Sequence, residues 1–214
     1  MTKFFALNIS VSKDGFMAGP NQSLDDPLGE NGEQLLALAW ATKSVREWSD
    51  LAGGTEGLTS DLWRRSLFNL GAIIMGRNMF GPIRGPWPNN EWKGWWGPNP
   101  GYKVPVFVLT HYARDPIDMG NGTTFIFVTG GVKQAYEMAL EVAGDRGVAI
   151  TGGAQTIQQF LNLELLEELH IVEIPIELKS GEKLFTNKEV QLKNFRALEP
   201  IATESVIHQT YLKV

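Results

Sequence analysis

Two stretches of this chain run from a short apolar strand through Thr-Gly-Gly directly into an amphipathic helix. They are FIFVTGGVKQAYEMAL at residues 125–140 and VAITGGAQTIQQFL at residues 148–161. A strand that enters a helix without a loop, and does so twice in succession, is typical of crossover units in a parallel sheet. Two units are too few for a repeat array, so we expect both to belong to one sheet.

The other periodic segments extend this sheet on both sides. Strands are predicted at 4–11, 72–76, 104–111, 123–129, 147–151 and 167–178. Helices are predicted at 33–48, 61–70, 131–144 and 154–166. Two final strand-like segments, 190–201 and 204–214, follow without helices between them and predict an antiparallel edge. With 214 residues, 43% of them apolar, we expect one α/β domain.

Composition excludes several functions. A net charge of −5 disfavours nucleic acid and anionic membranes as partners. The chain has no cysteine, which excludes disulfides, thiolate metal sites and a cysteine nucleophile. His and carboxylate residues show no ligand spacing, so no metal is expected. No apolar run is long enough to span a membrane and the N-terminus lacks a signal peptide, so a cytoplasmic location is expected.

The second glycine pair is a candidate anion site. Helix N-termini carry unpaired N–H groups and a partial positive charge, and glycine lets a ligand approach the backbone. Five residues are therefore expected to cradle a pyrophosphate: Gly152, Gly153, Ala154, Gln155 and Thr156. The alternative is tight packing of the helix on the strand with no ligand. Gly130 and Gly131 follow the same logic, but neither pair matches a Rossmann or P-loop motif.

Two further strand ends carry groups that suit phosphate. The strand AIIMG ends at Gly76, where Arg77 and Asn78 open a helical turn. An arginine there can bind a phosphate with two hydrogen bonds, although a solvated side chain is the alternative. Thr110 and His111 end another strand in the same way, with a surface histidine as the alternative. Three such strand ends at one sheet edge favour a dinucleotide.

Asp61 is the candidate acid. A carboxylate at a helix start that faces a ligand cleft can relay a proton. The alternative is an ordinary first-turn or N-cap residue. His170 and His208 fall inside strand patterns, which favours core or surface roles for both.

Residues 81–103 form a loop that is rich in Gly and Pro and holds four of the seven tryptophans. Its aromatic side chains either contact a planar ring, a partner or a second copy, or compact the loop onto the domain.

Several motifs together resemble the dihydrofolate reductase-like superfamily. They are SVSKDGFMAG, IIMGRNMFGP, VPVFVLTH and ITGGAQTIQQFLNLELLEELHIVEIPIELKSGEKLF, in that order. The chain looks most like the reductase domain of the bifunctional riboflavin-biosynthesis deaminase-reductase. The resemblance covers nearly the whole chain except residues about 20–58 and the loop 81–103.

The resemblance implies a three-layer sandwich around a mostly parallel eight-stranded sheet with an antiparallel C-terminal strand. It also implies NADPH, with the phosphates at Gly76, Arg77 and Asn78 and the 2′-phosphate near Thr110 and His111. The pyrophosphate and nicotinamide would lie at residues 152–156, where relatives often have a cis peptide between the two glycines. Residues 6–9 and the loop 14–18 would line the nicotinamide side.

Asp61 lies roughly where dihydrofolate reductases carry their acid, a residue on which the riboflavin branch does not depend in the same way. A deaminase domain would need Cys and His clusters for its zinc, and the sequence has no cysteine, so we expect a reductase without one.

The leading hypothesis is an NADPH-dependent reductase acting on a small heterocyclic or ribosylamino-pyrimidine substrate. Such an enzyme would resemble 5-amino-6-(5-phosphoribosylamino)uracil reductase or dihydrofolate reductase. The alternatives are a non-enzymatic protein that binds NADPH or a flavin, and an interaction module that uses its tryptophan loop. A homodimer is expected, because closed twofold symmetry is the commonest oligomer.

Overall fold

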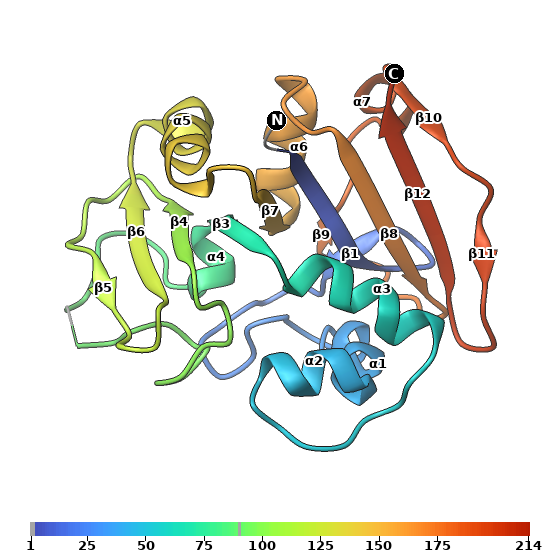
Figure 1. Ribbon diagram of the computed structural model, residues 1–214, viewed down its shortest axis with the longest axis horizontal. Helices are drawn as coiled ribbons and strands as arrows, with labels where there is room; N and C mark the ends of the chain where they lie inside the picture. The colour runs from blue at the N-terminus through green and yellow to red at the C-terminus, as the bar shows by residue number, and fades with distance from the viewer. Residues whose placement is uncertain (1–2, 90) are drawn as a thin grey trace.

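The computed structural model describes residues 3–89 and 91–214. Six parallel strands form the centre of its main sheet: β1 (Phe4–Ser12), β3 (Leu70–Gly76), β4 (Pro105–Leu109), β6 (Thr124–Val128), β7 (Gly147–Gly152) and β8 (Glu168–Ile174). Antiparallel strands complete both edges: β5 (Ile117–Asp118), β10 (Phe195–Ala197), β11 (Ile201–Ala202) and β12 (Ile207–Lys213). The strand order is β10-β12-β8-β1-β7-β3-β4-β6-β5, with β11 beside β12 (Figure 1).

The predicted fold class is confirmed. The expected eight strands correspond to those with three or more residues, and the two-residue strands β5 and β11 bring the described sheet to ten. A separate small sheet pairs β2 (Phe16–Ala18) with β9 (Glu182–Lys183).

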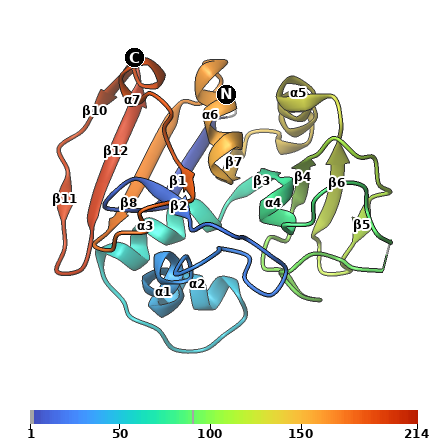
Figure 2. The same ribbon diagram turned by 180° about the vertical axis from the view of Figure 1, so that it is seen from behind.

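Helices cover both faces of the main sheet. They are α1 (Gln34–Ala41), α2 (Lys43–Trp48), α3 (Leu58–Leu67), α4 (Arg77–Phe80), α5 (Gly131–Ala143), α6 (Ala154–Asn162) and α7 (Lys188–Gln191). Figures 1 and 2 show α5 and α6 on one side of the sheet and α1, α2 and α3 on the other. Within the described chain, no helix has the length and apolar character needed to cross a bilayer.

The apolar strand β3 shows why the central strands carry no polar face. Its side chains alternate between two cores, since successive residues of a strand point to opposite faces. Ala72 and Ile74 belong to the core beneath α5 and α6, whereas Ile73 and Met75 belong to the core on the opposite face. Both faces are buried, so the strand is a continuous apolar run.

The tryptophan loop provides much of that second core. Trp87 and Trp92 contact the buried Phe80 ring at 5.8 and 5.3 Å between centroids. Trp95 and Trp96 both donate an indole hydrogen bond to the Met79 carbonyl, at 2.7 and 3.0 Å. These contacts confirm that the loop compacts onto the domain.

Some predicted elements differ from those observed. The helix predicted at 33–48 is two helices, because Thr42 adopts an extended conformation and its side chain caps α2 by accepting from the Val45 amide. The long strand predicted at 167–178 ends at Ile174, just before Pro175. Residues 188–191, expected in part as strand, form the short helix α7.

Two buried histidines connect β1 to α3. His170 Nδ1 accepts the Asn8 amide at 3.3 Å, so this nitrogen carries no proton. His170 Nε2 therefore donates to His208 Nδ1 at 3.2 Å, and His208 Nε2 donates to Thr59 Oγ1 at 3.2 Å. This run of hydrogen bonds requires both rings to be neutral. It agrees with a pKa of His170 lowered to about 4, first by burial and then by the nearby His208 and Arg65, which disfavour a positive charge on His170. Of the core and surface roles expected for these histidines, the structure shows the core role for both.

We expect this pair to make the protein acid-sensitive. The pKa of His170 rises from about 4 in the folded chain to an ordinary 6.5 on unfolding. As the pH falls, the unfolded state therefore binds the proton first. The contribution of His170 to the free energy of unfolding is at its maximum above pH 6.5 and decreases between pH 6.5 and about 4. When the pH is lowered from about 7 to about 4.5, the free energy of unfolding measured with urea should decrease by about 2 kcal/mol more in the wild type than in His170→Leu.

The exposed His111 provides the matched control. A His111→Leu variant should retain the wild-type pH dependence. Equal losses of stability in the wild type and His170→Leu would show that His170 is not the group responsible.

Candidate functional site

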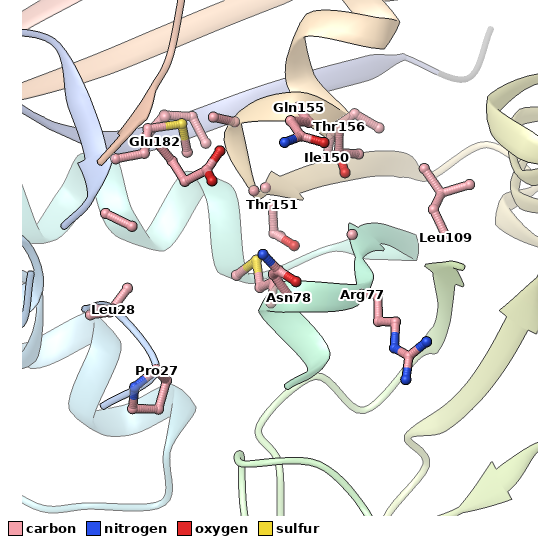
Figure 3. Close-up of a pocket in the computed structure, with 18 of the residues that line it drawn as sticks. Pro27, Leu28, Arg77, Asn78, Leu109, Ile150, Thr151, Gln155, Thr156 and Glu182 are labelled. Atoms are coloured by element: carbon pink, nitrogen blue, oxygen red, sulfur yellow. The ribbon is translucent and has the colours of Figure 1, made fainter. Parts of the chain in front are cut away.

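A cavity of 530 Å³ opens at the carboxyl ends of β3, β4 and β7. All ten residues predicted to bind a cofactor line it: Gly76, Arg77, Asn78, Thr110, His111, Gly152, Gly153, Ala154, Gln155 and Thr156. Figure 3 shows Arg77 and Leu109 on one side of this pocket and Pro27 and Leu28 on the other, with Asn78 and Thr151 between them. The cavity therefore has two ends, which differ in chemistry.

The glycines at the centre have separate roles. A Cβ on Gly76 would lie 2.5 Å from Thr156 Oγ1, so this glycine allows β3 and the start of α6 to pack closely. A Cβ on Gly153 would meet no protein atom within 4 Å, so its backbone borders open space. Gly153 also lacks any side-chain cap for α6. Close packing thus explains Gly76 but not Gly153, and the peptide bond between Gly152 and Gly153 is cis.

The first glycine pair is arranged differently. The Gly130 amide donates to Gln134 Oε1 at 2.9 Å, so the α5 N-terminus is partly satisfied by its own helix. Gly131, with a φ of +77°, lines the edge of the cavity beside Thr129.

Arg77 supplies positive charge at one end of the cavity. Its guanidinium lies 3.8 Å from the Trp87 ring centroid and 5.2 Å from that of Tyr112. Its Nε and Nη2 are buried without a hydrogen-bond partner among the described residues. Burial lowers the pKa of Arg77, and the neighbouring charges of Arg114 and Arg84 lower it further. A half-buried cation with two buried donors and other cations nearby suits an anionic ligand.

The other strand-end residues surround Arg77. Asn78 Oδ1 accepts from Arg84 Nη1 at 3.0 Å, which fixes the side-chain amide of Asn78. Thr110 Oγ1 accepts the Tyr112 amide at 3.2 Å and so holds the turn after β4. His111 is exposed at the rim. We call this cluster of Arg77, Asn78, Arg84, Thr110 and His111 the cationic end.

The opposite end is aromatic. Its walls come from α1, α2 and α3 and from the tryptophan loop. Its large side chains are Leu35, Leu36, Trp40, Trp48, Trp63, Leu67, Trp95, Trp96 and Tyr102. We call this region the aromatic end. Two of the four loop tryptophans thus face the cavity, while Trp87 and Trp92 pack in the core.

Asn8 lies in the wall of the aromatic end, at an irregularity of β1. Its φ is +55°, and the pairing of β1 with β8 shifts register between Ala6 and Ile9. The side-chain nitrogen donates to the Leu62 carbonyl at 2.8 Å and to Ser66 Oγ at 2.7 Å. Because a carbonyl only accepts, the amide orientation is fixed and Oδ1 is the buried atom without a partner among the described residues.

The segments expected to border the nicotinamide line the cavity only in part. From residues 6–9, Leu7, Asn8 and Ile9 do so, and from the loop 14–18, Met17 and Ala18. Asp14 instead holds its own turn, accepting from Ser12 Oγ at 2.6 Å. This hydrogen bond, with those from the Lys179 and Leu178 amides, lowers the pKa of Asp14.

Asp61 is not brought to the other predicted residues. Helix α3 starts at Leu58, three residues earlier than the sequence predicts, so Asp61 lies in its first turn. The side chain is exposed and does not line the cavity, whereas Trp63 and Leu67 do.

Glu182 is the carboxylate that sequence reasoning missed. It is the only Asp or Glu among the described residues that line the cavity. Strand β9 positions it by pairing with β2, and Figure 3 shows its carboxylate directed into the pocket. No local motif marks this residue, since its pairing partner Ala18 is distant in sequence.

Across residues 3–89 and 91–214, no group of three or more His, Asp or Glu side chains could hold a metal ion.

Comparisons with known proteins identify the family and the fold. The family model for the RibD C-terminal domain matches residues 3–208. A riboflavin biosynthesis protein from Shewanella sp. PV-4 has a similar structure, with a TM-score of 0.61 and 21% identity over 100% of this chain and 99% of that one. A dihydrofolate reductase from Enterococcus faecalis, complexed with NADP(H) and RAB-propyl, also has a similar structure. Its TM-score is 0.56, with 11% identity over 99% of this chain and 96% of that one.

A pyrimidine reductase-like protein from Corynebacterium diphtheriae gives a TM-score of 0.57 and 13% identity over 100% of this chain and 92% of that one. No curated protein is significantly similar to the chain in sequence.

Proposed function

Because this chain belongs to the RibD C-terminal domain family, we propose that it is an NADPH-dependent reductase of a small heterocyclic substrate. Membership of the family supports a reductase of the riboflavin-biosynthesis type. The enterococcal dihydrofolate reductase with a similar fold was solved with NADP(H). One observation carries the cofactor assignment: the buried donors Nε and Nη2 of Arg77 lack a partner among the described residues.

The residues present fit a dinucleotide. The open backbone at Gly153 and the uncapped first turn of α6 would hold the pyrophosphate, since N–H groups there point toward an anion. Arg77 would bind a further phosphate from the cationic end, with Thr110 and His111 beside it. A 2′-phosphate would satisfy these donors, whereas NADH, which lacks this group, would leave them buried and unpaired.

NADPH, when bound, supplies a hydride to a carbon of a C=N or C=O bond. The chain orients the two reactants in one cavity, which lowers the entropic part of the barrier. The neighbouring nitrogen or oxygen then requires a proton. Glu182 is placed to deliver it from a carboxyl oxygen, because it is the only carboxyl group in the described lining. Solvent returns the proton to Glu182.

Two isosteric variants compare Glu182 with Asp61. Glu182→Gln should lower kcat about tenfold. This is less than a general acid usually contributes, because water can also enter the open cavity and supply a proton. Asp61→Asn should leave kcat within about twofold, since this side chain is exposed outside the cavity. Steady-state NADPH oxidation measures both. A loss in Asp61→Asn with none in Glu182→Gln would return the proton-donor role to Asp61.

Titration with NADPH and NADH tests the proposal as a whole. We expect nicotinamide fluorescence to rise on binding and the melting temperature to increase with NADPH concentration. Absence of binding by either nucleotide at sub-millimolar concentration would refute the proposal. Tight binding without oxidation in the presence of pyrimidine and pterin substrates would favour a non-enzymatic NADPH- or flavin-binding protein. The homodimer expected from the sequence stays a prediction.

A further inference from the structure

The aromatic end of the cavity carries no positive charge from the helices that form its wall. Helices α1, α2 and α3 contribute nine lining residues, all of them apolar or aromatic except Ser66. The same helices hold six charged residues, none of which lines the cavity: Lys43, Arg46, Glu47, Asp61, Arg64 and Arg65. The sequence thus places charge on the outer face of these helices only.

The four cations of these helices are engaged outside the cavity. Lys43 pairs with Glu56 at 2.6 Å and Arg65 with Glu168 at 2.6 Å. Arg64 pairs with Glu47. Arg46 donates to the Ala52 carbonyl at 2.7 Å. None of them is available to a substrate phosphate in the aromatic end.

The two arginines that line the cavity belong to the opposite end. Arg77 stacks on Trp87, and Arg84 donates to Asn78. If the nucleotide binds at this cationic end, the aromatic end has no cation that could pair with the phosphate of a substrate. Placing an unpaired phosphate among tryptophans costs far more free energy than it returns.

Asn8 offers an acceptor at the aromatic end, where the hydroxyl of Tyr102 is also buried without a partner among the described residues. Asn8 is 4% exposed, and its side-chain nitrogen is held by Leu62 and Ser66. Its Oδ1 is therefore the atom left to accept a hydrogen bond, and it is buried in the cavity wall without a partner among the described residues. A ligand that supplies an N–H or amino group to it relieves the cost of an unpaired buried acceptor.

We propose that the substrate of this site is an uncharged, phosphate-free planar heterocycle, which stacks among the tryptophans of the aromatic end and donates an N–H to Asn8 Oδ1. This inference rests on the proposed function and narrows it. It selects the unphosphorylated member of the ribosylamino-pyrimidine class or another flat ring with an N–H edge. Such a ligand would be recognised by aromatic stacking and one directional hydrogen bond, without any contact to a phosphate.

Two matched pairs of ligands test the proposal on the full-length protein. One pair is 5-amino-6-ribosylaminouracil and its 5′-phosphate, and the other is riboflavin and flavin mononucleotide. Quenching of tryptophan fluorescence gives each affinity, with and without saturating NADP⁺. We expect the phosphate-free member of at least one pair to bind, and to bind about tenfold or more tightly than its phosphorylated partner. Equal or tighter binding of the phosphorylated member, or no binding of either phosphate-free ring, would overturn the proposal.

Variants of Asn8 separate recognition from folding. Asn8→Ala removes both the clamp on α3 and Oδ1, whereas Ser66→Ala weakens the clamp and leaves Oδ1 in place. Affinity for the phosphate-free ring should fall about 5- to 20-fold in Asn8→Ala and about twofold or less in Ser66→Ala. Equal losses in the two variants would assign Asn8 a structural role only and overturn its part in recognition.

NADPH binding distinguishes this proposal from the function on which it rests. If nicotinamide fluorescence reports NADPH binding but the phosphorylated ligands bind more tightly than the phosphate-free ones, the reductase assignment stands and the proposed substrate class is wrong. If NADPH does not bind, the reductase assignment fails whatever the affinities for the heterocyclic ligands are.

Discussion

A Gly153→Val variant is expected to remain folded and to bind NADPH at least about 100-fold more weakly than the wild type. The reason is that a Cβ at this position meets no protein atom within 4 Å. With φ at −70° and ψ at −166°, the backbone is extended and accepts a branched residue. The new side chain therefore projects into the space that the pyrophosphate and nicotinamide are proposed to fill.

Gly76→Ala is the informative contrast. Its Cβ would lie 2.5 Å from Thr156 Oγ1, inside the packing between β3 and α6. This variant should lower the melting temperature, whereas Gly153→Val should change it little. Nicotinamide fluorescence and thermal denaturation measure the two effects separately. Wild-type NADPH affinity in a folded Gly153→Val protein would show that no cofactor lies against this backbone.

That the ten candidate residues share one cavity was predictable, because the relevant signals are local. Each predicted residue follows directly on an apolar strand, and parallel strands bring their carboxyl ends to one edge of a sheet. The sequence therefore predicts that Gly76, Thr110 and Gly153 share a site without any knowledge of the loops. What local reasoning could not decide was which glycine serves packing and which faces a ligand. That distinction depends on Thr156 reaching across to Gly76.

Which carboxylate lines the cavity was not predictable, because this depends on helix register and on long-range pairing. Starting α3 at Leu58 instead of Asp61 turns the Asp61 side chain outward. Glu182 enters the cavity only because β9 pairs with β2, which lies more than 160 residues earlier. A charged residue in a two-residue strand has no periodicity to reveal it.

Asn8 illustrates a further limit. In the sequence it interrupts an apolar strand and reads as an ordinary polar position. Its role follows from a register shift in β1 and from contacts with α3 and with His170. Each of these depends on partners more than fifty residues away. Tertiary pairing, and not propensity, thus produces the unpaired acceptor in the wall of the aromatic end.

Arg77→Met is expected to have opposite effects on cofactor affinity and on stability. Methionine retains contact with Trp87 but removes the hydrogen bonds that the guanidinium would make to phosphate. The dissociation constant for NADPH should rise about 30- to 100-fold, since charge-assisted hydrogen bonds contribute about 1.5–3 kcal/mol. NADH, which lacks the 2′-phosphate, should lose far less affinity, so that the preference for NADPH collapses.

The melting temperature of the ligand-free protein should be unchanged or higher in Arg77→Met. The wild-type side chain keeps two donors buried without partners among the described residues, near Arg84 and Arg114. Replacing such a cation by an apolar group removes a desolvation cost. Arg196→Met, on the exposed strand β10, is the matched control and should change neither affinity nor nucleotide preference. Equal losses for NADPH and NADH in Arg77→Met would place Arg77 at the shared pyrophosphate instead of the 2′-phosphate.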